Sequence, residues 1–262
     1  KQELLVIYSD EESAACVDYY DWDGAQLRVQ ASLRLSMAVA ELSRLTVGTL
    51  AGGENALFVT GVTADSMTVT DVLALRGGRL QNVALGPEGN QVPAASAFLG
   101  LYPHDEDGDG VTEVPEARPL QRLDRESEQL YYIAWRQYSA DGGAADVRSS
   151  FHNVPDGWSL TLPEEWDKAA LTAGRSAGVD QTSVSFYRVG ENGAHETLLT
   201  IYRLTGASRE ELASAGGRVA LTRQVEAVYA AELGETWGVQ LDEQSLRDRF
   251  SLIVAEWTTG DN

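Results

Sequence analysis

Residues 67–85 of the chain read MTVTDVLALRGGRLQNVAL, and this stretch is the clearest guide to the fold. Its first half is rich in Val, Thr and Leu, a Gly77-Gly78 pair follows, and a second apolar run closes at Leu85. Aliphatic and β-branched residues on both sides of a Gly-Gly pair are typical of two antiparallel strands that a tight turn connects. The stretch therefore predicts a β-hairpin with strands over 67–75 and 79–85.

The same pattern of short strands extends in both directions. Upstream, residues 44–50 and 56–62 form two further apolar runs, and residues 25–35 alternate apolar and polar side chains. Downstream, residues 129–138 and 145–152 read as strands on either side of a Gly-rich turn. Such a succession predicts antiparallel β repeats of the kind found in propeller blades. We expect about three blade-like units, 1–36, 37–92 and 93–153.

The composition changes after residue 153, where a turn containing Pro155 and Gly157 begins. Strands over 182–189 and 196–204 are followed by helix signals after Ser208 and Asp242. The expected fold class is therefore mainly β followed by α+β: partial β-propeller-like, antiparallel four-stranded repeats over 1–153 and a small α+β domain over 154–262. The final helix would present one apolar face, made of Leu246, Phe250, Ile253, Val254 and Trp257.

An acidic loop is the stretch with the strongest chemical content, since residues 103–116 read PHDEDGDGVTEVPE. Carboxylates at every second position point toward one small cavity, and Gly110 supplies a sharp turn after them. A cage of hard oxygen atoms suits Ca²⁺. The predicted ligands are the carboxylates of Asp105, Asp107, Asp109 and Glu113 and the carbonyl oxygen of Val111.

The setting of this loop distinguishes two kinds of calcium site. An EF-hand loop lies between two helices, whereas Pro115 and Pro119 stop a helix after this loop, and residues 97–102 before it are strand-like. The sequence therefore favours a calcium loop between β segments. Mg²⁺ is less suitable because it retains several waters. The remaining alternative is an acidic surface turn that binds no metal.

Composition narrows the function classes. The net charge of −20 excludes nucleic acid as a partner and disfavours an anionic membrane surface. A hydrophobic fraction of 43% is sufficient for a packed core. Cys16 is the single cysteine, so no intrachain disulfide forms. No apolar run approaches the ~20 residues of a membrane span.

No catalytic motif is evident in the sequence. His104, His152 and His195 are scattered without metal-ligand spacing, and the chain has no P-loop, no dinucleotide fingerprint and no G-x-S-x-G elbow. We expect Trp158 and Trp166 to pack in the core, and the alternative is that they line a ligand groove. The sequence favours a protein that is not an enzyme and leaves the question open.

The acidic loop HDEDGDGVTEVPEARPL (104–120) is similar to the loop of FG-GAP and VCBS repeats, which occur in integrin-like β-propellers. The stretches ALFVTG, YYIAWRQY and SSFHNVPDGWSLTLPEEW also resemble bacterial extracellular lipoproteins that contain VCBS repeats. The resemblance covers most of residues 1–166. It implies that the chain is the C-terminal portion of such a protein, since KQELLVIYS looks like the end of an earlier repeat.

This resemblance implies a calcium-stabilised protein that is exported to the cell surface, with a lipid anchor on a cysteine upstream of Lys1. Two departures stand out, because Cys16 lies in no lipobox and three blades cannot close a propeller. The expected function is a non-enzymatic, calcium-stabilised cell-surface or secreted module that binds or scaffolds an unknown protein or glycan. The alternative is an extracellular hydrolase or carbohydrate-binding protein with a site between the β repeats and the C-terminal domain.

Overall fold

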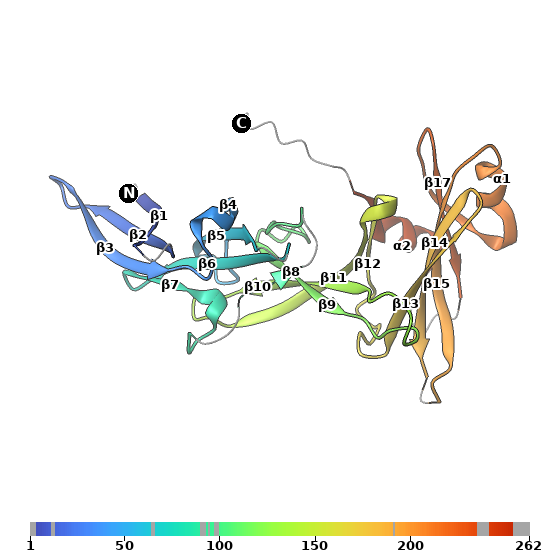
Figure 1. The fold of residues 1–262 in the computed structure, drawn as a ribbon, viewed down its shortest axis with the longest axis horizontal. Helices are drawn as coiled ribbons and strands as arrows, with labels where there is room; N and C mark the ends of the chain where they lie inside the picture. Colours follow the sequence, from blue (N-terminus) through green and yellow to red (C-terminus); the bar gives the residue numbers. More distant parts are fainter. Residues whose placement is uncertain are drawn as a thin grey trace. The chain divides into compact units, whose positions relative to one another are not determined.

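The computed structural model describes residues 4–11, 14–63, 66–89, 93, 95–96, 100–190, 192–234 and 241–253. Over these residues the chain is mainly β, with antiparallel strands in four hydrogen-bonded sheets and two short α-helices (Figure 1). The prediction of a mainly β chain is confirmed. No helix among the described residues is long and apolar enough to cross a bilayer.

The chain divides into two compact units. The first unit comprises residues 1–117 and 133–148, and the second comprises residues 118–132 and 149–262. Three strands therefore contribute residues to both units: β9 (Glu113–Pro119), β10 (Tyr131–Tyr138) and β11 (Ala144–Asn153).

The first sheet contains β1 (Leu4–Ser9), β2 (Ala15–Trp22) and β3 (Leu27–Arg34), with β2 in the middle. Alternate residues of β2, among them Val17 and Tyr19, are buried in a hydrophobic cluster that includes residues of the second sheet. Such alternation is what an antiparallel sheet with one face on the core requires. The strands expected over residues 1–36 are confirmed.

The second sheet contains the predicted hairpin. β6 (Thr68–Arg76) and β7 (Arg79–Asn82) pair in antiparallel register around the glycine turn, as expected. The second strand ends earlier than predicted, because the Asn82 side chain accepts a hydrogen bond from the Ala84 N–H at 3.2 Å and caps a 3-10 helix there. The other strands of this sheet are β4 (Leu42–Thr49), β5 (Asn55–Val62) and β8 (Ala95–Ser96).

Two five-stranded sheets follow. The third sheet adds β12 (Trp158–Thr161) and β18 (Phe250–Leu252) to β11, β10 and β9. The strand order of the fourth sheet is β13-β14-β15-β17-β16. Its strands are β13 (Leu171–Gly178), β14 (Gln181–Val189), β15 (His195–Leu204), β16 (Val219–Arg223) and β17 (Val228–Leu233).

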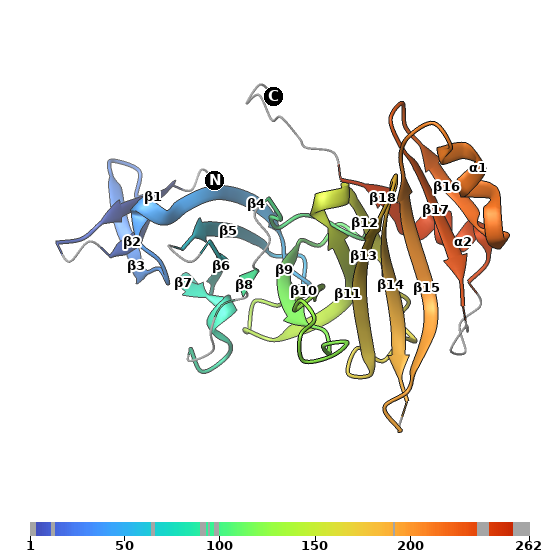
Figure 2. The same ribbon diagram turned by 45° about the vertical axis from the view of Figure 1, so that its right-hand side comes forward.

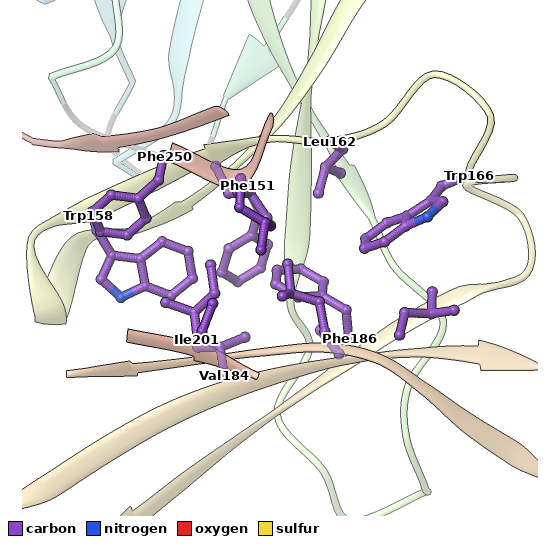
Figure 3. Packing of buried hydrophobic residues seen from close by; sticks show 14 of the residues in the cluster. Phe151, Trp158, Leu162, Trp166, Val184, Phe186, Ile201 and Phe250 are labelled. Atoms are coloured by element: carbon purple, nitrogen blue, oxygen red, sulfur yellow. The ribbon is translucent and has the colours of Figure 1, made fainter. Parts of the chain in front are cut away.

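The main core of the second unit packs large aromatic side chains among aliphatic ones, as Figure 3 shows. Trp158 and Trp166 are only 0% and 1% exposed, and their rings lie about 6 Å from those of Phe151 and Phe186 respectively. The expectation that both tryptophans belong to the core is confirmed. Neither side chain is available to line a ligand groove.

The second unit also carries the helices α1 (Arg209–Ser214) and α2 (Glu243–Arg249). Asp242 caps α2 as predicted, with its carboxylate accepting from the Ser245 N–H at 2.8 Å. The predicted helix is too long, because Phe250 begins β18 and pairs there with Leu160 of β12. Of the residues predicted to lie on its apolar face, Leu246 is buried in α2, Ile253 follows β18, and Val254 and Trp257 lie outside the described residues.

The sheets of the described residues remain separate in their hydrogen bonding, and none closes into a barrel. A propeller-like arrangement of the three units therefore stays a prediction. The domain boundary predicted between residues 153 and 154 lies at the end of β11, whereas the compact units divide within β9, β10 and β11.

Candidate metal centre

The acidic loop closes between two backbone segments of the first unit. The N–H and C=O groups of His104 and Glu113 exchange hydrogen bonds of 3.2 and 2.9 Å, which makes an antiparallel bridge at the base of the loop. The Thr112 N–H donates to the Thr49 carbonyl at 2.9 Å and ties the loop to the end of β4. Strand β9 follows the loop directly. The loop is therefore surrounded by β structure, as was predicted from Pro115 and Pro119.

The strand predicted before the loop is only partly described. Residues 97–99 lie outside the described residues, and residues 100–103 have no regular secondary structure. Among the described residues, no helix directly precedes or follows the loop. An EF-hand loop, by contrast, lies between two helices.

The loop is folded around the carboxylate of Asp105. Its Oδ1 accepts from the Gly108 N–H at 2.7 Å, and its Oδ2 accepts from the Gly110 N–H at 2.9 Å. Both glycines have positive φ angles, 80° and 86°, a region that other residues adopt only with strain. The D-x-D-G-D-G spacing therefore places small residues where the backbone must turn sharply.

Three side chains converge inside this loop. One oxygen atom of each of Asp105, Asp107 and Asp109 lies within 4.8 Å of the others. Oxygens that bind the same Ca²⁺ at ~2.3–2.6 Å lie at most ~5 Å apart, so this spacing fits a shared calcium ion. All three carboxylates are accessible to solvent, which leaves room for water ligands. The donor set consists of hard oxygens and suits Ca²⁺ better than a transition metal.

Glu113 lies next to this group but differs from it in its environment. It is fully buried, with Oε1 accepting from the Gln137 side-chain nitrogen and Oε2 from the Glu106 N–H, both at 2.7 Å. Burial is the main cause that raises the pKa of Glu113, and the charges of Asp107 and Asp109 raise it further. Glu113 is not among the converging oxygens, so its role as a ligand stays a prediction.

Gln137 connects the converging aspartates to Glu113. Its Nε2 atom also donates to Oδ2 of Asp109 at 2.9 Å, while Oδ1 of Asp109 accepts from the Val111 N–H at 2.8 Å. These two hydrogen bonds lower the pKa of Asp109 and favour its charged form. Val111 contributes its N–H to this loop, and the role of its carbonyl oxygen as a ligand stays a prediction.

His104 lies beside the loop, where its ring nitrogens make hydrogen bonds instead of joining the three converging aspartates. Its Nε2 atom lies 2.8 Å from a carboxylate oxygen of Glu106, and its Nδ1 atom lies 2.8 Å from the Tyr102 carbonyl. The ring packs edge-on against the buried Trp135, with centroids 4.9 Å apart. The Glu106 carboxylate is the main cause that raises the pKa of His104. His104 is therefore a hydrogen-bonded residue beside the loop.

Sequence reasoning missed Gln137 and Glu106 as parts of this centre. Gln137 is 24 residues from Glu113 in the chain, in a strand whose other residues gave only a β pattern. Glu106 lies within the loop but points toward His104 instead of joining the three aspartates. Gln137 could be recognised only once β9 and β10 are known to be neighbours in the sheet, and local sequence does not specify that pairing.

Comparison with known proteins finds no matching family model, no similar curated protein and no similar solved structure.

Proposed function

We propose that this chain is a non-enzymatic binding or scaffolding module, secreted or at the cell surface, that calcium stabilises. The observation that supports the proposal most is the convergence of Asp105, Asp107 and Asp109 to within 4.8 Å. Three like charges at that distance repel one another, and a divalent cation between them would remove the repulsion.

Calcium would act by holding together segments that are distant in the chain. The loop contacts the end of β4 through Thr112 and contacts β10 through Gln137. An ion bound to the aspartates would therefore stabilise the junction of β4, β9 and β10. By mass action, a free calcium concentration of about 100 times Kd would add about 2.7 kcal/mol to the free energy of unfolding.

The repeat pattern supports the wider part of the proposal. Antiparallel sheets of short strands follow one another along the first unit, and a VCBS-like acidic loop enters the strand β9. In this proposal the module is exported, a lipid anchor lies upstream of Lys1, and the partner is a protein or glycan of unknown identity. The blade-like units 1–36, 37–92 and 93–153 would then be part of a larger propeller.

The experiment is a thermal melt of the chelated protein titrated with Ca²⁺ and, in parallel, with Mg²⁺. The informative variant is Asp107→Asn, which removes a charge but keeps the oxygen that accepts from the Asp109 N–H at 3.2 Å. In EDTA it should melt at or slightly above the temperature of the parent chain, because one of the repelling charges is removed, and it should lose most of the stabilisation by Ca²⁺.

A matched control is Asp141→Asn in the same unit. Asp141 accepts from the Gly143 N–H at 3.1 Å in an exposed turn, but it is not one of the three converging residues. This variant should keep the full response to Ca²⁺. A parent chain whose melting temperature is equal with and without Ca²⁺ would make the loop an acidic turn and remove the metal from the proposal.

A further inference from the structure

The strand β1 differs from every other edge strand among the described residues. Proteins normally protect the unpaired backbone groups of an edge strand with a charged residue, a proline or a short length. Here β3, β4, β13 and β16 each contain an arginine, β9 contains two prolines, and β7, β8 and β18 have at most four residues. β1 reads LLVIYS over six residues and has none of these protections.

The outer edge of β1 is open. The order of the first sheet is β1-β2-β3, and within the described part of the chain the backbone groups of residues 4–9 form hydrogen bonds only with β2. Leu5 and Ile7 pack against the hydrophobic cluster between the first two sheets, whereas Leu4 and Val6 are exposed on the other face. An uncharged strand with apolar side chains and unpaired backbone groups is a ready template for a further strand.

The first two sheets, which both lie in the first unit, stack face to face but differ in width. β1 contacts the 3-10 helix Val39–Glu41, which directly precedes β4, and β3 contacts β7. The strands of both sheets therefore follow one another in the same direction (Figure 2). This row has four strands in the second sheet, β4 to β7, and three in the first sheet. On the β4 side, one strand of the second sheet lacks a covering strand.

The exposure of side chains in β4 locates this gap. Leu45 of β4 pairs with Val59 of β5, so both side chains point to the face that the first sheet covers. Val59 is 0% exposed, whereas Leu45 is 56% exposed and Val47 is 79% exposed. The cover therefore ends above β5. A strand added ~4.8 Å beyond the open edge of β1 would lie above Leu45 and Val47.

These features specify the kind of occupant. Only an extended backbone matches the row of N–H and C=O groups along an edge strand. Its inward side chains have to be apolar, because they would bury Leu45 and Val47. A second copy of this chain fits poorly, since pairing through its own β1 would bring its own β4 into the space where β4 of the first copy already lies. The gap suits a single strand.

We propose that β1 accepts one extended strand of a partner protein, whose apolar side chains at alternate positions cover Leu45 and Val47. This names a partner class for the binding module proposed above and rests on that part of the proposed function. It does not depend on calcium, because none of the converging aspartates belongs to β1 or β4. Strand binding should therefore be equal in Ca²⁺ and in EDTA, so that its failure is distinguishable from failure of the calcium titration.

The experiment measures binding of a synthetic peptide to the full chain by isothermal titration calorimetry. The peptide alternates valine and threonine over the length of β1 and has acetylated and amidated ends, so that it carries no charge. A control peptide has the same composition, with the valines and threonines in two separate blocks. The alternating peptide should bind, and the control peptide should bind at least about tenfold more weakly because only part of its valines face β4.

The test variant is the double substitution Leu45→Ser and Val47→Ser. It should weaken binding of the alternating peptide by about tenfold or more, because the apolar contact below the added strand is lost. Both side chains are already exposed, so the fold should be retained. The matched control is Val179→Ser with Val225→Ser, two valines that are 90% exposed in turns of the second unit. This control should bind like the parent chain.

Amide hydrogen exchange locates the contact. The N–H groups of residues 4–9 that face the open edge should exchange rapidly in the parent chain and become protected when the alternating peptide binds. Protection of these groups before the peptide is added would mean that the edge is already filled, and would overturn the proposal. Absence of peptide binding would also overturn it, as would equal loss of binding in the test and control variants.

Two further outcomes would replace the partner protein with another occupant. Sedimentation of the parent chain as a dimer that Leu45→Ser with Val47→Ser dissociates would assign the edge to a second copy. Peptide binding that disappears in a longer form of the polypeptide, extended upstream of Lys1, would assign the edge to a strand of the same chain. Either result would overturn the proposal.

Discussion

The side-chain nitrogen of Gln137 lies 2.7 Å from Oε1 of Glu113, and this hydrogen bond joins the end of β10 to the first residue of β9 beneath the acidic loop. The same nitrogen donates to Asp109 at 2.9 Å. One amide group therefore satisfies a buried carboxylate and one of the converging aspartates at once.

Replacing Gln137 with Ala should destabilise the metal-free protein. The substitution leaves a buried Glu113 oxygen without its donor, which costs about 1–3 kcal/mol of the free energy of unfolding. Urea denaturation in EDTA measures the change. Gln30→Ala, at an exposed position of β3, is a control that should change stability by less than about 0.5 kcal/mol. Equal effects of the two substitutions would show that the hydrogen bond to Glu113 carries no stability.

Replacing Gly110 with Ala tests the turn inside the loop. The φ angle of Gly110 is 86°, but a Cβ atom there would meet nothing within 4 Å. The cost should therefore come from the backbone alone, about 1–2 kcal/mol. Because the strain moves the Asp105 hydrogen bond as well, the variant should also bind Ca²⁺ more weakly in a calorimetric titration. A variant with unchanged stability and unchanged affinity would contradict this.

Replacing Trp166 with Phe should cost much less than replacing it with Ala. The indole N–H of Trp166 has no hydrogen-bond partner among the described residues, although the side chain is 1% exposed. Phe removes that unsatisfied donor and keeps most of the packing against Phe186, whereas Ala leaves a cavity that costs about 3–5 kcal/mol. Denaturant unfolding of both variants measures the difference, and similar losses would show that the donor does have a partner in solution.

The pH dependence of the metal-free protein should show the raised pKa of Glu113. A carboxyl group whose pKa is higher in the folded state binds its proton more tightly there, so stability should increase as pH falls through that raised pKa toward the usual value of about 4.3. Raising the pH above this window should remove the contribution. Asp109, whose pKa is lowered, acts in the opposite direction at pH values below its usual pKa.

Thermal melts between pH 4 and pH 8 in EDTA check this sign. Glu113→Gln should flatten the part of the profile above the usual pKa of a glutamate, because Gln does not titrate. In the presence of Ca²⁺ the trend should weaken, since ligand carboxylates bind the ion only when they are ionised. A Glu113→Gln profile parallel to that of the parent chain would mean that Glu113 is not the group responsible.

Most strands were predictable because their residues carry the pattern locally. The hairpin of β6 and β7 follows from its glycine pair, and β3 follows from the alternation of apolar and polar residues over 25–35. β13 was not predicted, since LTAGRSAG has little β propensity. It forms because it pairs with β14, and Gly174 within it allows the Leu123 side chain to come within 2.9 Å of where a Cβ would lie.

The errors in the C-terminal part and in the candidate centre have the same origin. Phe250 fits the helical period of α2, but pairing with Leu160 places it in a strand instead. The three aspartates were predictable because they lie within one loop, whereas Gln137 joins them through the pairing of distant strands. Local spacing specifies the loop, and tertiary pairing specifies what surrounds it.

The strands β9, β10 and β11 belong partly to each compact unit. Neither unit is therefore a continuous segment of the chain, because each is interrupted by residues of the other. A single recombination event could not move one unit alone into another protein. Gene duplication or domain shuffling would have to copy both units together.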